Sequence, residues 1–393
     1  MRHLHFLHSF LAGASFSAMA LFAAGASANP SVLFDLNSGR VLAHEEAFQR
    51  WHPASLTKLM TAYVTFRAMD AGELDLTSPI NVSKNSASEQ PAKMGYKPGS
   101  VMNLDNALKM MLVRSANDIA MAIGENVGGT EEDFAARMNA EAARLGMSDT
   151  HFVNPNGLHA DDQYTTAHDL ALLVMALRRE YPQYMPYFSI EGLLAGKKKL
   201  SNFNLLVGRY AGADGMKTGF ICPSGFNMIG SATRDGRTLV AIVLGEKTAV
   251  TRAELVAKLL DQGFANQNIG AQTVAGLTRY GQGIDTVRNV RDEICPKPVK
   301  GQKAEQPSEQ ASDKAKSPFL EKLDHPPKLI AVGLGNATGK VPAAYAAAIA
   351  AGKVPDVDGI PIPTPRPDYT ASTASTIVPE ASAKPAKASQ VGG

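Results

Sequence analysis

Two residues near the start of the chain have the types and the spacing of a nucleophile and its base. Ser55 precedes Lys58 by three residues in the stretch PASLTKLM, residues 53–60. In a helix this spacing places both side chains on one face, one turn apart. A serine hydroxyl needs an adjacent base, and a lysine serves as that base only when burial or a second cation lowers its pKa. Alone, the pair is a weak signal, because serine often begins helices and lysine is common on them.

Two further motifs supply what a serine–lysine pair lacks. Ser115 and Asn117 lie in RSAND between two apolar segments, and Lys217, Thr218 and Gly219 lie in DGMKTGF before a predicted hairpin. The order Ser-x-x-Lys, Ser-x-Asn, Lys-Thr-Gly is the signature of the penicillin-binding, serine-acylating enzymes. The two motif serines are 60 residues apart, and the second serine lies 102 residues before the lysine of the third motif. The ordered set is far more specific than any one of its parts.

The residue types predict separate roles in acyl transfer. Ser55 would attack a carbonyl, Lys58 would take its proton, and Ser115 would relay a proton to the leaving amine. Asn117 would hold the substrate amide and the ammonium of the base. Lys217 adds a positive charge, which favours a neutral base and attracts a carboxylate.

The third motif also predicts substrate-binding groups. Thr218 can hydrogen-bond a substrate carboxylate, and Gly219 has no side chain, so a substrate backbone can lie along the strand. The backbone N–H groups of Ser55 and Phe220 are candidates for the oxyanion hole. We expect neither a metal nor another cofactor, because no metal-ligand spacing appears and His151, His159 and His168 lie in predicted loops and helix starts.

With these motifs the chain resembles the low-molecular-mass penicillin-binding proteins, specifically the serine-type D-alanyl-D-alanine carboxypeptidases of the peptidase S11 family. The resemblance covers residues 30–263 and includes the segments RWHPASLTKLMTAYVTF, LVRSANDIAMAIGE and FAARMNAEAARLGMSDTHFVNPNGL. It implies hydrolysis of the terminal D-alanine of peptidoglycan stem pentapeptides through an acyl-enzyme on Ser55, and acylation of Ser55 by β-lactams. It also implies a β-lactamase/transpeptidase-like fold, with a five-stranded antiparallel sheet flanked by helices and a helical subdomain that carries Ser115.

Two other enzyme functions use the same constellation, and a third alternative is not an enzyme. A D,D-endopeptidase that cuts peptidoglycan cross-links differs only in which acceptor end fits. A β-lactamase usually needs a Glu-x-x-Leu-Asn loop between the second and third motifs, and NPNGLH occupies part of that region instead. A catalytically silent cell-wall binding protein would have no need of the intact motifs. The sequence leaves open the choice between carboxypeptidase and endopeptidase, the rate of deacylation and the oligomeric state.

The elements that must position these residues follow from hydrophobic periodicity and turn residues. Residues 31–45 predict a hairpin around Asn37–Gly39, and residues 225–245 predict a second hairpin that turns at Asp235–Gly236. Helical spacing is present over residues 55–69, on both sides of Ser115, over 131–147 and over 253–264. Hairpins at both ends with helices between them predict an α+β fold.

The first 28 residues predict export. An apolar run over residues 10–24 follows a short basic start and ends at Ala26-Ser27-Ala28, a small-x-small cleavage site. We therefore expect a signal peptide over residues 1–28, a periplasmic protein and a catalytic domain over residues 29–268. The formal net charge of +2 gives no reason to expect a nucleic-acid partner.

Composition changes after the last predicted helix. Pro, Ala, Lys and Ser dominate residues 269–393 and aromatic residues nearly vanish, so we expect a largely disordered tail with one Ala-rich piece of helical character. The tail shows no strong amphipathic pattern, which argues against a membrane anchor. Export permits a disulfide between Cys222 and Cys295, but their pairing stays open.

Overall fold

A five-stranded antiparallel sheet built from both ends of the folded chain supports the site. The computed structural model describes residues 29–266, 270–297, 317–321, 323 and 325–353, so the signal-peptide prediction for residues 1–28 lies outside the described residues. The strand order is β2-β1-β9-β8-β7. The strands are β1 (Ser31–Asp35), β2 (Val41–Glu45), β7 (Ala213–Ile221), β8 (Gly225–Arg234) and β9 (Arg237–Glu246). Both predicted hairpins are present, as β1–β2 and β8–β9.

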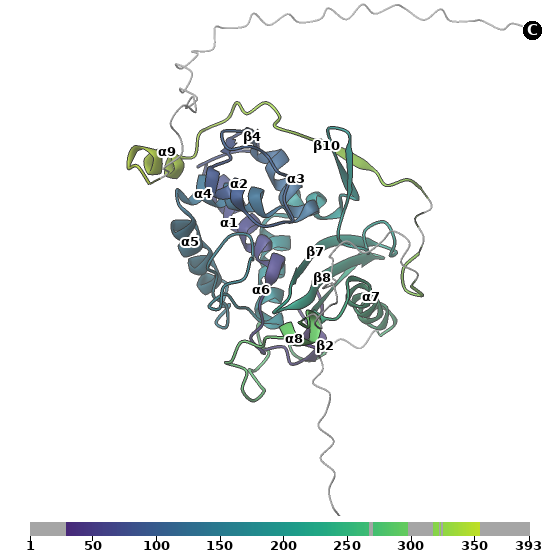
Figure 1. The fold of residues 1–393 in the computed structure, drawn as a ribbon. Helices are drawn as coiled ribbons and strands as arrows, with labels where there is room; N and C mark the ends of the chain where they lie inside the picture. The colour runs from purple at the N-terminus through teal and green to yellow at the C-terminus, as the bar shows by residue number, and fades with distance from the viewer. Residues whose placement is uncertain (1–28, 267–269, 298–316, 322, 324, 354–393) are drawn as a thin grey trace, which may run out of the picture.

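Each face of this sheet is buried against its own helices. In β1, Val32 and Phe34 belong to the larger core and Leu33 between them belongs to a second core. Successive side chains of a strand point to opposite faces, so a sheet covered on both sides has nearly continuous apolar strands. Helix α7 (Ala249–Ala265) covers the second core, and α6 (Ala167–Glu180) packs against β1 and β9 from the other side (Figure 1).

The helices that lie between β2 and α6 in the chain form a subdomain beside the sheet (Figure 1). Its central helix is α4 (Asn117–Gly128), all 12 residues of which are buried, including the polar or charged Asn117, Asp118, Glu125 and Asn126. The elements of this part are the 3-10 helix η1 (Ala54–Thr57), α1 (Lys58–Asp70), β3 (Pro79–Asn81), α2 (Lys84–Ser88), β4 (Val101–Asn103), α3 (Leu104–Arg114), α4 (Asn117–Gly128) and α5 (Glu131–Arg144).

A small three-stranded sheet joins the C-terminal part of the chain to the rest. The 3-10 helix η2 (Pro182–Ser189) leads into the hairpin β5 (Gly192–Ala195) and β6 (Lys198–Ser201). Strand β10 (Leu329–Val332) pairs in parallel with β5, and α9 (Ala343–Ala350) packs against α4. In Figure 1 the chain between them passes over the helical subdomain. The Ala-rich piece is therefore a helix with a defined position.

The described parts of the segment after residue 268 differ from the expected disorder. Residues 270–297 contain the short helix α8 (Arg291–Ile294) and place Val274, Val290 and Ile294 in the larger core. Cys295 forms a disulfide with Cys222, with 5.7 Å between the two Cα atoms. The apolar residues of this stretch are few and irregularly spaced, so they leave no periodic signal, yet each fills a place beside the domain.

The described residues contain no helix that is both long enough and apolar enough to cross a bilayer.

Candidate active site

Ser55 and Lys58 lie where η1 continues into α1. Lys58 is fully buried, and its Nζ lies 2.9 Å from Ser55 Oγ. The same Nζ donates hydrogen bonds to Asn117 Oδ1 at 2.7 Å and to the backbone oxygen of Asn156 at 2.5 Å. An ammonium has three donors, and these three acceptors surround it. The amine is therefore held in one orientation against the hydroxyl.

The backbone just before the serine is strained and tightly supported. Ala54 has a φ of 48°, in the left-handed region that residues with a Cβ rarely adopt. Gly157 contacts it so closely that a Cβ at Gly157 would lie 1.9 Å from the Ala54 oxygen. Strain of this kind persists only where surrounding structure enforces it, and it is frequent at active sites. The Asn156–Gly157 turn thus supports both the serine backbone and the lysine.

Sequence reasoning missed that turn as part of the site. Its residues lie in NPNGLH, a stretch considered only as the place where a β-lactamase motif would be. The available signal was the Asn-Gly pair, which is typical of a turn that needs a positive φ, and Gly157 has a φ of 84°.

The second motif lies between two helices of the subdomain. Ser115 follows the last residue of α3 in a left-handed conformation, with a φ of 58°, and Asn117 begins α4. Asn117 Oδ1 accepts the hydrogen bond from Lys58 Nζ, and Asn117 Nδ2 donates to the backbone oxygen of Gln90 at 2.8 Å. Ser115 Oγ accepts a hydrogen bond from Lys217 Nζ at 2.9 Å. The second motif is therefore hydrogen-bonded to the first motif through Asn117 and to the third motif through Ser115.

The third motif lies on β7, the terminal strand of the sheet. Lys217 and Thr218 are buried, and Lys217 Nζ also donates to the Thr218 oxygen at 2.7 Å. A Cβ at Gly219 would lie 2.8 Å from the backbone nitrogen of Ser55. Packing within the protein therefore also requires a glycine at position 219, because a Cβ there would prevent β7 from approaching Ser55 this closely. Phe220 follows on the same strand.

A buried arginine supports β7 from behind. Arg252, on α7, is 1% exposed, and its Nη1 donates to the backbone oxygens of Gly219 and Asn227, each at 3.2 Å. Its guanidinium also lies 5.4 Å from the ring centre of Phe226. Sequence reasoning missed this residue, since a lone arginine on an amphipathic helix is usually solvent-exposed.

An ion pair supports the start of the same strand. Asp214 accepts from Arg178 at 2.5 Å and from the hydroxyls of Ser231 and Thr233. Burial alone would raise the pKa of Asp214, but the charge of Arg178 and these hydrogen bonds outweigh burial and hold the pKa below its ordinary value. The carboxylate therefore stays charged and anchors β7 to α6.

The three histidines contact residues outside the three motifs. His151 Nδ1 lies 2.8 Å from the Asp162 oxygen, and His168 Nε2 lies 2.9 Å from the Val274 oxygen. His159 packs edge-on against His52, whose pKa is lowered by burial. Within the described ranges, no three His, Cys, Asp or Glu residues are placed to hold a metal ion.

Comparison with known proteins identifies the family of this chain. Residues 17–248 match the peptidase S11 family model, described as D-alanyl-D-alanine carboxypeptidase. The chain is 37% identical over 240 residues to D-alanyl-D-alanine carboxypeptidase DacC of Escherichia coli, covering 59% of this chain and 60% of that protein. It is 31% identical over 247 residues to DacF of Bacillus subtilis, covering 61% of this chain and 62% of that protein. The chain thus spans about 60% of the length of the curated relatives it matches.

Solved structures show the same fold. The D-alanyl-D-alanine carboxypeptidase DacD from Francisella tularensis aligns with a TM-score of 0.58 and 31% identity, covering 61% of this chain and 70% of that one. Penicillin-binding protein D2 from Listeria monocytogenes, in its cefotaxime-bound form, aligns with a TM-score of 0.55 and 33% identity, covering 61% of this chain and 97% of that one. The predicted α+β fold with a five-stranded antiparallel sheet is confirmed. By the family match, this chain belongs to the peptidase S11 family of D-alanyl-D-alanine carboxypeptidases.

Proposed function

We propose that this chain removes the terminal D-alanine from peptidoglycan stem pentapeptides through an acyl-enzyme on Ser55. The observation that carries the proposal is the 2.9 Å contact between Ser55 Oγ and the buried Nζ of Lys58, in a chain of the S11 family. A buried amine that loses its proton is a base in direct reach of the hydroxyl, as nucleophilic catalysis requires. Ser55, Lys58, Ser115 and Asn117 are the proposed catalytic residues.

Acylation would begin with attack of Ser55 Oγ on the carbonyl carbon between the two D-alanines, while its proton moves to Lys58. The backbone N–H groups of Ser55 and Phe220 would stabilise the oxyanion. Collapse of the tetrahedral intermediate breaks the C–N bond, and the leaving amine takes a proton through Ser115, which Lys217 contacts at 2.9 Å. Water would then hydrolyse the ester, with Lys58 again as the base.

Substrate would bind along the terminal strand of the sheet. Lys217 and Thr218 would hold the carboxylate of the last D-alanine, and Gly219 would leave room for the peptide backbone beside β7. β-Lactams carry a carboxylate and a reactive amide in a similar relation, so we expect them to acylate Ser55 as well. The proposed setting is the periplasm, with residues 1–28 as the signal peptide and a catalytic unit that begins at residue 29.

The test compares products and labelling in the mature protein and in two serine variants. Incubation with a pentapeptide should release one D-alanine, seen by mass, and a fluorescent penicillin should label the protein. Ser55→Ala should abolish both. Ser189→Ala, which changes an exposed serine of η2, should affect neither. Cleavage of cross-linked muropeptides without release of D-alanine would establish an endopeptidase instead, and labelling of Ser55→Ala would show that another residue is the nucleophile.

A further inference from the structure

The stretch of chain beyond the family match contacts both sides of the reaction centre. The match ends at residue 248, and residues 270–297, here called the C-terminal clamp, lie after it. The clamp is folded onto the domain, with Val274, Ile284 and Val290 among the residues of the larger core. Its other contacts include those to the segment before Ser55 and to the residues that follow β7.

On one side the clamp pairs with the segment that leads to the nucleophile. The Arg50 backbone N–H donates to the Ile284 oxygen at 3.1 Å, and the Arg288 N–H donates to the Arg50 oxygen at 3.0 Å. Gln49 Nε2 donates to the Thr286 oxygen at 2.8 Å. These contacts lie five and six residues before the catalytic serine. The clamp therefore fixes the backbone from which η1 begins.

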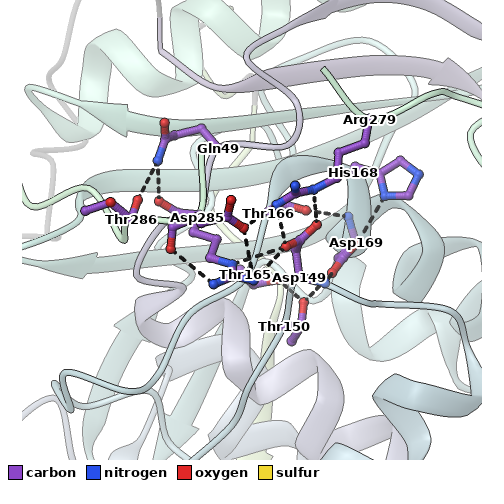
Figure 2. Close-up of polar contacts among 11 residues, drawn as sticks. Gln49, Asp149, Thr150, Thr165, Thr166, His168, Asp169, Arg279, Asp285 and Thr286 are labelled. Atoms are coloured by element: carbon purple, nitrogen blue, oxygen red, sulfur yellow. Dashed lines mark hydrogen bonds and ion pairs between the residues drawn. The ribbon is translucent and has the colours of Figure 1, made fainter. Parts of the chain in front are cut away.

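Side chains strengthen this side of the clamp (Figure 2). The Asp149 carboxylate, 6% exposed, receives two hydrogen bonds from Arg50, at 2.9 and 3.1 Å, and two from Arg279 of the clamp, at 2.8 and 2.9 Å. Arg279 also contacts Asp285 at 2.7 Å, and His168 Nε2 lies 2.9 Å from a clamp backbone oxygen. Bidentate arginine–carboxylate pairs fix orientation as well as distance.

On the other side the clamp holds the end of β7. The Val290 N–H donates to the Pro223 oxygen at 2.9 Å, and Cys295 is bonded to Cys222. Cys222 follows Phe220, the proposed second oxyanion donor, by two residues. The disulfide therefore attaches the clamp covalently next to that donor.

Trp51 connects the two sides. Its side chain is 1% exposed, and its Nε1 donates to the Ser224 oxygen at 2.8 Å. The Arg288 guanidinium of the clamp lies 5.8 Å from the centre of the tryptophan ring. The segment before the nucleophile, the turn after β7 and the clamp thus form one closed set of contacts.

We propose that the C-terminal clamp positions the two N–H groups of the oxyanion hole, with Cys222, Cys295 and Arg279 as positioning residues for acylation. The inference rests on the proposed function. The two donors, on Ser55 and Phe220, come from separate segments that meet at Gly219, so a small shift of either segment misplaces a donor. A misplacement of about 1 Å costs on the order of 100-fold in rate, whereas ground-state binding through the third motif is retained.

The experiment measures acylation of the full chain by a chromogenic penicillin. In the Cys222→Ala/Cys295→Ala variant and in Arg279→Ala, the acylation rate constant at saturating penicillin should fall at least about tenfold, with the half-saturation concentration changed less than about twofold. Arg137→Ala removes the half-exposed ion pair between Arg137 of α5 and Glu73, which lies outside the clamp, and should keep the wild-type rate. Circular dichroism establishes that each variant is folded at the assay temperature.

A dithiol reductant provides an independent check should the alanine variant not fold. Reduction of the disulfide should lower the acylation rate constant of the wild type. It should lower the rate constant of Arg137→Ala, which keeps the disulfide, by the same factor. Folded variants, or reduced wild type, that melt at a lower temperature but are acylated at the wild-type rate would overturn the inference, since the clamp would then only stabilise the fold. If unaltered wild type is not acylated at all, the proposed function fails instead.

Discussion

Lys58 is the residue that we propose as the base for Ser55. It is fully buried, with Asn117 and Asn156 supplying uncharged oxygens to its Nζ. Both of these acceptors are uncharged, although the nearby Glu89 carboxyl group interacts electrostatically with Lys58. Lys217 donates to Ser115 Oγ at 2.9 Å. The hydrogen bonds orient the amine towards Ser55 Oγ, from which we propose that it takes a proton.

Gly219 gives a sharp test at the residue scale. Gly219→Ala would place a methyl group 2.8 Å from the Ser55 backbone nitrogen, so β7 or η1 must move apart. We expect the acylation rate constant for penicillin to fall on the order of 100-fold, because the two proposed oxyanion donors lie on these segments. Gly333→Ala is the matched control, since nothing lies within 4 Å of the added methyl group. An active Gly219→Ala enzyme would contradict this packing argument.

At the scale of elements, α5 begins at an acidic cluster that should make stability depend on pH. Burial, the largest cause, and the charges of Glu89, Glu132 and Glu125 together raise the pKa of Glu131 to about 7. The ordinary value is 4.5. The folded state therefore carries no penalty below about pH 4.5, and the penalty grows until the side chain is ionised above about pH 7.

Glu131→Gln should remove this penalty. After allowance for solvent screening and for the favourable helix dipole at this position, we expect the free energy of unfolding to rise by about 1 kcal/mol at pH 8 and to be unchanged at pH 4. Urea unfolding at the two pH values measures the difference. Glu132→Gln, at an exposed neighbouring position, should give a smaller gain. Equal gains at both pH values for Glu131→Gln would show that ionisation is not the cause.

At the scale of the whole molecule, the disulfide ties the end of the sheet to the C-terminal segment. Cys222 and Cys295 are 73 residues apart, and cross-linking a loop of that length limits the unfolded chain by up to about 4 kcal/mol. We expect reduction to lower the free energy of unfolding by up to that amount, measured by guanidinium unfolding with and without a dithiol. The Cys222→Ala/Cys295→Ala variant should be insensitive to the dithiol. An unchanged wild-type midpoint would mean that the cross-link does not limit the unfolded chain.

Much of the fold and the chemical groups of the site could be predicted from the sequence. The sheet hairpins and the main helices have regular hydrophobic spacing, which reports which face of each element is buried. The three motifs name residue types whose chemistry is useful only in combination, so Ser55, Ser115 and Lys217 could be assigned to one site before any geometry was known. Hydrophobic spacing and short motifs are both patterns of residue types along the chain, so one sequence is enough to find them.

Only the tertiary structure decided what supports those groups. Gly157 against Ala54, Arg252 behind Gly219 and the pairing of Cys222 with Cys295 join segments far apart in the chain. Each is a single contact without a repeating pattern, so periodicity could not reveal it. The same reason explains why residues 270–297, expected to be disordered, are folded. Their stability comes from places that the rest of the domain provides, which become visible only once the chain is folded.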